Sequence, residues 1–157
     1  MRLFLMVDYL MGNSNKQKGH TAEFFACYHI SQEGFKPFLI PHGQAFDVFA
    51  TNDITGELIR VQVKSSNQYS TSPDRNGKGR QIVIPRGFVW NLQIGISKTE
   101  QYDFKALEIF ALVNLEQEMI AFIPANELAS HPTKATIKVK DMAQYTFKRA
   151  MKHLHNT

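Results

Sequence analysis

The 157-residue sequence contains a single cysteine, Cys27. One cysteine excludes an intramolecular disulfide and a zinc site built from several thiolates, and it favours a reducing intracellular compartment. The chain also lacks any apolar run near the ~20 residues that a helix needs to span a bilayer. Its apolar start is short and is interrupted by Asp8, which makes it a poor signal peptide. We therefore expect a cytoplasmic protein with no membrane partner.

Repeats, low-complexity stretches and linker-like segments are also absent, so nothing in the sequence divides the chain. Apolar residues make up 43% and charged residues 20%, which is the composition of a globular protein and excludes a disordered chain, a collagen or a coiled coil. A chain of this length buries enough apolar surface to fold without disulfides or zinc. We expect residues 1–157 to form one domain.

Positive charge is concentrated in two segments, although the net charge of the whole chain is only +4. Residues 134–157 contain one acid, Asp141, and carry a net charge of +5, so the first 133 residues carry −1. Residues 74–86 carry a net charge of +3. The bases of the two segments are Lys134, Lys138, Lys140, Lys148, Arg149 and Lys152 in the first, and Arg75, Lys78, Arg80 and Arg86 in the second. Basic clusters of this kind favour a polyanionic partner such as nucleic acid.

Hydrophobic periodicity predicts a mixed α and β domain. A helix is expected from an N-cap at Thr21 to a C-terminal glycine, Gly34, and residues 12–19 are either a loop or an earlier start capped by Ser14. A short helix capped by Asn126 and a terminal helix capped by Asp141 follow later. Strands are expected at residues 35–40, 45–51, 58–65, 81–84, 88–96, 109–113, 119–123 and 137–139, with a mobile loop at 67–80 and a turn at 85–87. The fold class is α/β or α+β, with one central mixed sheet flanked by helices.

Polar side chains gather on one face of the hairpin formed by residues 45–51 and 58–65. If Asn52 faces Glu57 across the intervening turn, Asp47 lies opposite Gln62, and Lys64 is diagonal to Asp47 on the same face. The alternating apolar residues of both strands favour this register, since a slip of one residue would place them on the wrong face. The sequence therefore predicts a carboxylate, an amide and an ammonium close together.

Four short motifs follow one another on these expected elements. They are Lys18-Gly19, Ala22-Glu23 on the helix, Pro41 to Asp47, and Val61-Gln62-Val63-Lys64 on the third strand. In this order they resemble the PD-(D/E)XK nuclease superfamily, most closely its group I intron-associated homing endonucleases, in which Gln-x-Lys replaces the acidic version. Archaeal Holliday-junction resolvases are the next most similar. The resemblance covers residues 18–66 and extends weakly to the hairpin that ends at Pro124.

The resemblance implies a single-domain, restriction-endonuclease-like fold and a set of catalytic residues: Glu23, Asp47, Gln62 and Lys64. It also implies a Mg²⁺ ion, with Mn²⁺ as a substitute, held by Asp47, Glu23, Gln62 and the backbone carbonyl of Val63. Gln62 stands where the family usually has an acid, and Pro41 lies six residues before Asp47 rather than beside it. From the residues alone, Glu23 is equally well explained by a favourable interaction with its helix dipole.

The resemblance divides the domain into a catalytic core at about 18–66, a DNA-contacting loop and hairpin at 67–97, and a basic terminal helix at 141–155. The expected DNA-contacting residues are Arg75, Lys78, Arg80, Arg86, Lys148, Arg149 and Lys152. One site of this type cuts one strand, so a double-strand break implies a homodimer or a higher homo-oligomer. Residues 1–11 and the alternating strand 88–96 are the expected interface elements. Bound to DNA, such a protein would lie at the nucleoid of a bacterial or phage-infected cell.

The leading hypothesis from the sequence is thus a metal-dependent, site-specific endonuclease for double-stranded DNA. Two alternatives remain open. One is a Holliday-junction resolvase or another repair or restriction nuclease of the same fold. The other is a non-catalytic DNA-binding protein on a degenerate nuclease fold, in which Gln62 marks the decay.

Overall fold

The computed structural model describes residues 15–41, 44–72, 84–93 and 102–156. The first half contains α2 (Asn15–Gln32), β1 (Lys36–Leu39), β2 (Val48–Thr51), β3 (Leu58–Ser65), β4 (Tyr69–Ser72) and β5 (Ile84–Asn91). The second half contains β6 (Ile109–Asn114), β7 (Met119–Pro124), α3 (Ala125–Leu128), β8 (Lys134–Ile137), the 3-10 helix η1 (Val139–Gln144) and α4 (Phe147–His155). No helix within these ranges is long and apolar enough to cross a membrane.

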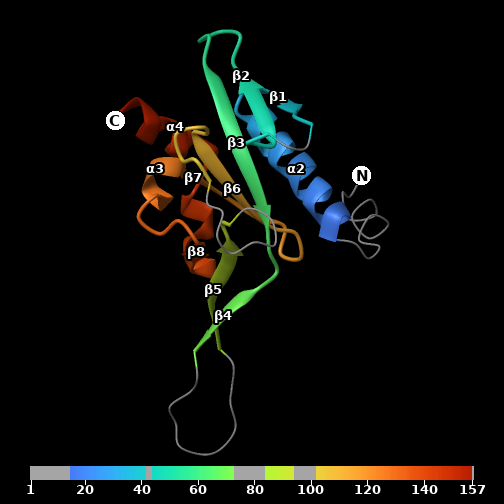
Figure 1. The fold of residues 1–157 in the computed structure, drawn as a ribbon, viewed down its shortest axis with the longest axis vertical. Coiled ribbons are helices and arrows are strands. Elements are labelled where there is room, and N and C mark those ends of the chain that lie inside the picture. The colour runs from blue at the N-terminus through green and yellow to red at the C-terminus, as the bar shows by residue number, and fades with distance from the viewer. Residues whose placement is uncertain (1–14, 42–43, 73–83, 94–101, 157) are drawn as a thin grey trace, which may run out of the picture.

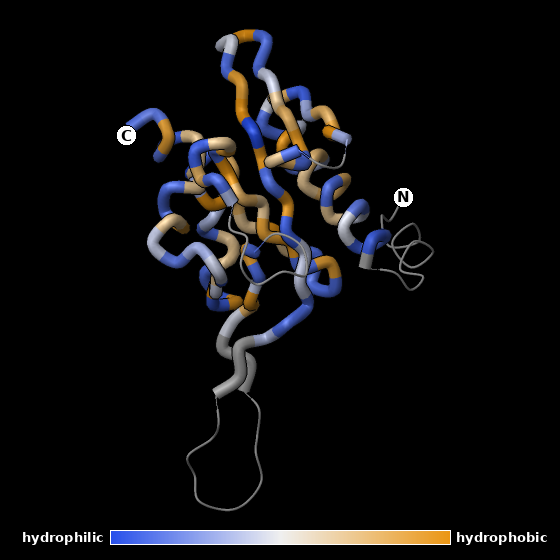
Figure 2. The backbone as a smooth tube through the Cα atoms, viewed as in Figure 1, coloured by the Kyte–Doolittle hydropathy of each residue, from blue (hydrophilic) through white to orange (hydrophobic). Residues whose placement is uncertain are grey.

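Five strands form a mixed sheet in the order β1-β2-β3-β6-β7 (Figure 1). The central pair, β3 and β6, is parallel, and the other neighbours are antiparallel. This confirms the central mixed sheet expected from the sequence, including the hairpin of β6 and β7. In Figure 2, the central strand β6 is mostly hydrophobic, and hydrophobic and hydrophilic residues alternate along its neighbour β3.

A second sheet, of three antiparallel strands in the order β4-β5-β8, was not expected from the sequence. The prediction of a loop at 67–80 is wrong for β4, and residues 73–83 lie outside the described ranges. The predicted turn at 85–87 is wrong as well, because β5 runs through it. Gly87 makes the pairing possible, since a Cβ there would lie 2.4 Å from the carbonyl oxygen of Ile137 on β8. In Figure 1, β4 and the start of β5 project beyond the five-stranded sheet.

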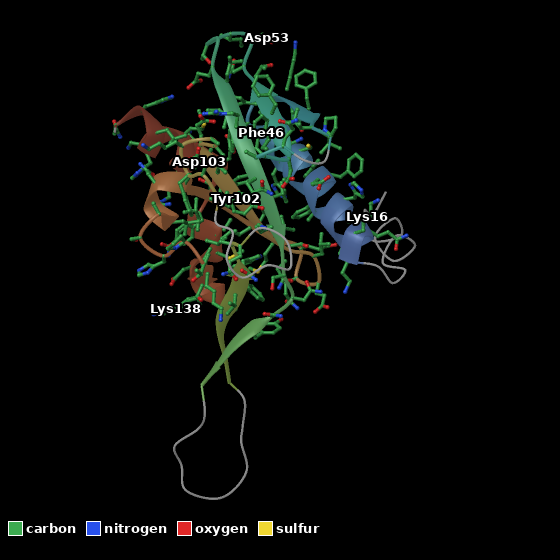
Figure 3. All side chains as sticks on the ribbon, viewed as in Figure 1. Lys16, Phe46, Asp53, Tyr102, Asp103 and Lys138 are labelled. Carbon is green, nitrogen blue, oxygen red and sulfur yellow. The ribbon has the colours of Figure 1, made fainter. Side chains whose placement is uncertain are left out.

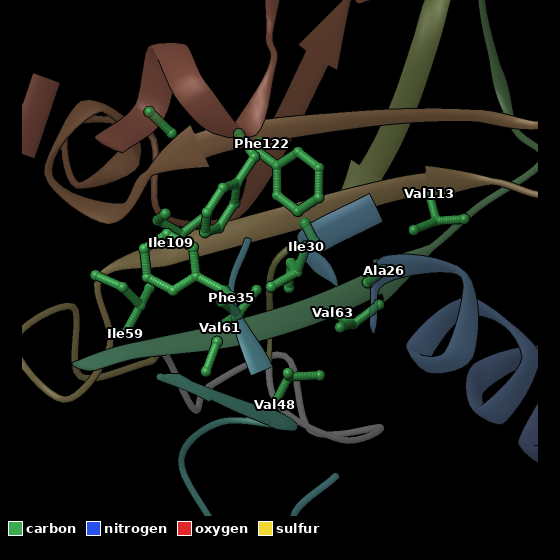
Figure 4. Packing of buried hydrophobic residues seen from close by; sticks show 14 of the residues in the cluster. Ala26, Ile30, Phe35, Val48, Ile59, Val61, Val63, Ile109, Val113 and Phe122 are labelled. Carbon is green, nitrogen blue, oxygen red and sulfur yellow. The ribbon is translucent and has the colours of Figure 1, made fainter. Parts of the chain in front are cut away.

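Helix α2 covers one face of the five-stranded sheet. Its buried side chains Ala22, Ala26 and Ile30 pack in one cluster with alternate residues of the strands, among them Val48 and Val61 (Figure 4). Thr21 is not the N-cap: the helix begins at Asn15, and the Thr21 hydroxyl donates to the carbonyl of Gln17 at 2.9 Å inside it. The predicted C-terminal glycine is confirmed, because Gly34 has a φ of 82°.

The opposite face of the sheet is covered by β5, α3, β8 and η1, whereas α4 packs in the same cluster as α2. Phe88, Trp90 and Leu92 are buried there in a second cluster with Phe110 and Leu112 of β6. These three side chains of the expected strand 88–96 are buried inside the molecule, so the prediction that they form a subunit interface is wrong for Phe88, Trp90 and Leu92. Residues 94–96 and the other expected interface element, residues 1–11, lie outside the described ranges.

Two predicted helix caps are wrong. Asn126 lies inside α3, which begins at Ala125. Asp141 lies in η1, and α4 begins after Thr146, whose hydroxyl accepts from the backbone N–H of Arg149 at 3.1 Å. Strand β8 ends at Ile137, where the sequence predicted a strand to begin. The bounds of β8 follow from its pairing with β5, which local patterns do not reveal.

Candidate active site

The candidate site lies where β2 begins beside β3. The predicted register is confirmed, since Val48 pairs with Val61 and Thr51 pairs with Leu58. The strand is shorter than the expected 45–51, so Ala45 lies outside the ladder with Lys64. Asp47 immediately precedes the strand, and its backbone N–H still donates to the Val61 carbonyl at 3.0 Å.

The Asp47 carboxylate completes the hydrogen bonding of β3. In this register, the residue opposite Val63 would be Phe46, but the ladder ends at Val48. The N–H of Val63 instead donates to Oδ2 of Asp47 at 2.8 Å. A carboxylate thereby replaces the missing backbone acceptor, because an unpaired buried N–H is costly. The Asp47 side chain is held at the end of β2, where the two strands separate.

Gln62 is buried, with only 5% of its surface exposed, and its side chain points to Asp47. Its amide Nε2 donates to Oδ2 of Asp47 and lies 3.3 Å from the Val63 carbonyl oxygen. The carboxylate, the side-chain amide and the backbone carbonyl therefore meet around one point. The sequence predicted the first two as neighbours, and the structure brings them into direct contact.

Lys64 lies two residues further along β3 and is half-buried. Burial lowers the pKa of its ammonium below the ordinary value, and the nearby Asp47 carboxylate opposes that shift. The Nζ atom donates to the backbone carbonyl of Gln93 at 3.1 Å and lies 4.6 Å from the centre of the Tyr102 ring. The cation and Asp47 thus interact electrostatically, as the predicted diagonal placement implies.

Glu23 occupies α2 in different surroundings. Its carboxylate is 15% exposed and lies 3.1 Å from Nδ1 of His20, one turn earlier. Together with burial, which has the larger effect, Glu23 raises the pKa of the Cys27 thiol to about 11. The contacts described for Glu23 are with its own helix, so its joining the Asp47 cluster stays a prediction.

The donor set at Asp47 suits a hard divalent cation. Such ions take carboxylate, amide and carbonyl oxygens, and a carboxylate, a side-chain amide and a backbone carbonyl meet at Asp47, Gln62 and Val63, the amide through its Nε2. A cation bound by the Asp47 carboxylate and the Val63 carbonyl would lie close to the present position of Gln62 Nε2, which donates to both of these oxygens. Within the described residues, no group of three or more His, Cys, Asp and Glu side chains could hold a metal. A metal here would therefore depend on the neutral oxygens as well as on carboxylates.

The basic residues expected to contact DNA are only partly described. Arg75, Lys78 and Arg80 lie outside the described ranges, and Arg86 is described only as a backbone position of β5. On α4, Lys148 and Lys152 are exposed. Arg149 is used within the chain, since its guanidinium lies 3.5 Å from Glu127 and 4.8 Å from the centre of the Tyr145 ring.

Tyr102 and Gln93, which contact Lys64, were not predicted from the sequence. Neither residue belongs to a recognisable motif. Gln93 follows β5 and Tyr102 precedes β6, and both are distant from β3 in the chain. These two residues could have been predicted as neighbours of Lys64 only if it were known that β5 packs over the sheet face that carries Gln62 and Lys64.

Comparisons with known proteins identify the family and the fold. A family model described as PD-(D/E)XK endonuclease matches residues 13–154. Among solved structures, the chain is similar to "the structure of a bacterial homing endonuclease: I-Ssp6803I", with a TM-score of 0.57 and 17% identity. That match covers 80% of this chain and 78% of the other, and at this identity it shows a shared fold. No curated protein sequence matches significantly.

Proposed function

This chain belongs to the PD-(D/E)XK endonuclease family, and from that premise we propose that it is a metal-dependent, site-specific endonuclease for double-stranded DNA. One observation carries the proposal: a half-buried lysine, Lys64, lies beside a carboxylate, Asp47, that is grouped with two further oxygen-bearing groups. Burying charged groups costs free energy, so an arrangement of this kind is retained for chemistry more readily than for stability.

Phosphodiester hydrolysis requires an activated water and stabilisation of negative charge in the transition state. When bound, Mg²⁺ or Mn²⁺ supplies Lewis acidity and lowers the pKa of a coordinated water. Asp47 would be the central ligand, joined by the Val63 carbonyl, by Gln62 and by Glu23 from α2. For Gln62 to serve, its amide must turn so that Oε1 replaces Nε2 at this point, which exchanges a donor for an acceptor.

Lys64 has a separate role in the proposal. Its ammonium would donate to the attacking water and to a phosphate oxygen, which orients the nucleophile and stabilises the developing charge. A compact ammonium suits this role because it acts as a point charge. The Asp47 carboxylate favours the charged form of this lysine, which burial disfavours, through its effect on the Lys64 pKa.

We propose that DNA is bound by two groups of basic residues. One group consists of Arg86 on β5 and of Arg75, Lys78 and Arg80, which lie outside the described residues. The other lies on α4 and consists of Lys148, Arg149 and Lys152. A two-stranded ribbon can enter the major groove, and lysines and arginines contact the phosphates.

Because one such site cuts one strand, we propose that the protein acts as a homodimer or a higher homo-oligomer on DNA. We also propose that the protein lies in the cytoplasm, at the nucleoid when it is bound to DNA, because its proposed substrate is DNA. Analytical ultracentrifugation with and without a DNA duplex tests the oligomer: a monomer in both conditions contradicts it.

The activity is tested by incubating the purified protein and Mg²⁺ with a genomic DNA library, with plasmid and with a four-way junction. Discrete fragments from duplex DNA are expected. Asp47→Ala and Lys64→Ala should abolish cleavage and leave DNA binding intact. Asp53→Ala and Lys36→Ala are matched controls, because these residues form an exposed ion pair between the β2–β3 turn and β1.

The other outcomes are equally informative. Preferential cutting of the junction would favour a resolvase over a site-specific endonuclease. DNA binding without cleavage under any metal would indicate a degenerate nuclease fold. Cleavage that persists in both site variants would show that the reaction takes place elsewhere.

A further inference from the structure

Lys64 is flanked by two groups that come from outside β2 and β3. The Gln93 carbonyl accepts a hydrogen bond from Nζ at 3.1 Å, and the Tyr102 ring lies under the same atom at 4.6 Å. Tyr102 is itself fixed, because its ring packs edge-on against Phe110 of β6 with centroids 5.5 Å apart. Tyr102 and Phe46, both labelled in Figure 3, pack against the second core cluster, on the sheet face that carries Gln62 and Lys64.

A lysine side chain has four flexible torsions, so an ammonium needs fixed neighbours to hold one position. The carbonyl supplies one such neighbour, and the face of an aromatic ring supplies another through a cation–π interaction. The aromatic contact also suits partial burial, since it attracts the cation without adding a second negative charge beside Asp47.

We propose that Tyr102 is a positioning residue for Lys64, with its ring holding the ammonium toward the Asp47 site. The role in catalysis rests on the proposed nuclease function, whereas the contact itself does not. Tyr102 acts through its ring and does not transfer a proton. In agreement with this, burial and the nearby Asp47 carboxylate raise the pKa of the Tyr102 phenol above its ordinary value, so it stays neutral near pH 7.

Three variants separate the ring from the hydroxyl and from general packing. Tyr102→Phe keeps the ring, and Tyr102→Leu removes it while keeping an apolar side chain. Phe104→Leu is the matched control, because Phe104 belongs to the same cluster and packs on the same Phe110 ring at 5.7 Å. If the Leu variant does not fold, as judged by thermal unfolding, Tyr102→Met replaces it.

The first readout is independent of activity. In the metal-free wild-type protein at one fixed pH, NMR should show the Lys64 Cε protons shifted upfield by the ring, relative to those of exposed Lys16. The shift should persist in Tyr102→Phe and in the Phe104→Leu control, and it should disappear in Tyr102→Leu. An unshifted Lys64 in the wild type would overturn the proposal, whatever the protein does to DNA.

The second readout is single-turnover cleavage at saturating protein. Tyr102→Leu should slow cleavage roughly threefold to thirtyfold with unchanged DNA affinity, the range expected for a partly desolvated cation–π contact. Tyr102→Phe and Phe104→Leu should cleave at nearly the wild-type rate. Wild-type cleavage together with a fully active Leu variant, or with an inactive Phe variant, would overturn the positioning role. A wild type that shows the NMR shift but cuts no DNA would contradict the nuclease function and leave the ring contact established.

Discussion

The side-chain amide of Gln62 donates a hydrogen bond to the carboxylate of Asp47 across the β2–β3 pair. In the family pattern this position usually holds a second carboxylate, which would repel Asp47. The amide leaves the charge of Asp47 in place, but it donates a hydrogen bond to one of the carboxylate oxygens. The contact is therefore favourable without a cation. A site of this kind should hold a metal less tightly than one with two acids.

The first prediction exchanges this amide for a carboxylate. Gln62→Glu places two acids in contact, so without metal the free energy of unfolding should fall by roughly 1–3 kcal/mol at pH 7. Mg²⁺ should restore the loss, and the stabilisation by Mg²⁺ should exceed that of the wild type. Thermal unfolding in EDTA and in Mg²⁺ measures both effects. Gln68→Glu, at an exposed position beyond β3, is the control. A Gln62→Glu variant that is insensitive to Mg²⁺ would show that no cation binds at this point.

The second prediction concerns the cost of burying Lys64. Lys64→Met should abolish cleavage yet raise Tm at pH 7 by about 2–4 °C, since it removes a charge whose burial is unfavourable. Lysine with a pKa lowered by folding releases its proton more easily in the folded state. Wild-type stability therefore rises as pH increases through that lowered pKa toward the ordinary value. The gap in Tm between the two proteins should narrow over the same range.

Thermal unfolding of the wild type and of Lys64→Met at several pH values between neutral pH and pH 10 measures how the difference in Tm changes with pH. A gap that widens with pH would mean that folding favours the charged lysine. The exposed Lys36→Met variant serves as the comparison, because Lys36 lies at the surface in an ion pair with Asp53.

The third prediction compares two glycines. Gly87→Ala should lower the free energy of unfolding by roughly 1–3 kcal/mol, because its Cβ would lie 2.4 Å from the Ile137 carbonyl oxygen, which is backbone and cannot move freely. Gly19→Ala on α2 should instead stabilise the protein by up to about 1 kcal/mol, since no atom outside the helix backbone lies within 4 Å of the added methyl. Urea unfolding of both variants measures the difference. Equal effects would contradict the pairing of β5 with β8.

The fourth prediction concerns the exposed lysines of α4. The double variant Lys148→Ala, Lys152→Ala should weaken DNA binding and reduce the slope of log affinity against log salt by roughly 1–2. Arg149→Ala should lower both the salt slope and the free energy of unfolding, because Arg149 is also paired with Glu127 and stacked on Tyr145. Fluorescence anisotropy at several salt concentrations measures binding. A salt slope that is unchanged in the double variant would exclude this face of α4 from the DNA interface.

Local sequence determined the part of the site that lies on one hairpin. The register of β2 and β3 follows from the alternation of apolar residues and from the turn at Asn52, whose side chain accepts from Ile54 N–H at 3.0 Å while Gly56 adopts a φ of 74°. Both signals act over a few residues, so Asp47 and Gln62 could be placed together from the sequence. The C-terminal glycine of α2 and the hairpin of β6 and β7 were predicted for the same reason.

Tertiary structure alone decided what surrounds that hairpin. Strand β4 is polar and short, and it forms because β5 offers a partner and β8 completes the sheet. The Tyr102 ring and the Gln93 carbonyl reach Lys64 only because β5 and the segment before β6 pack over the same face of the sheet. Hydrophobic periodicity specifies which side of a strand is buried, but it does not specify which distant segment covers that side. The residues that carry charge were therefore visible in the sequence, and the neighbours that position the Lys64 ammonium were not.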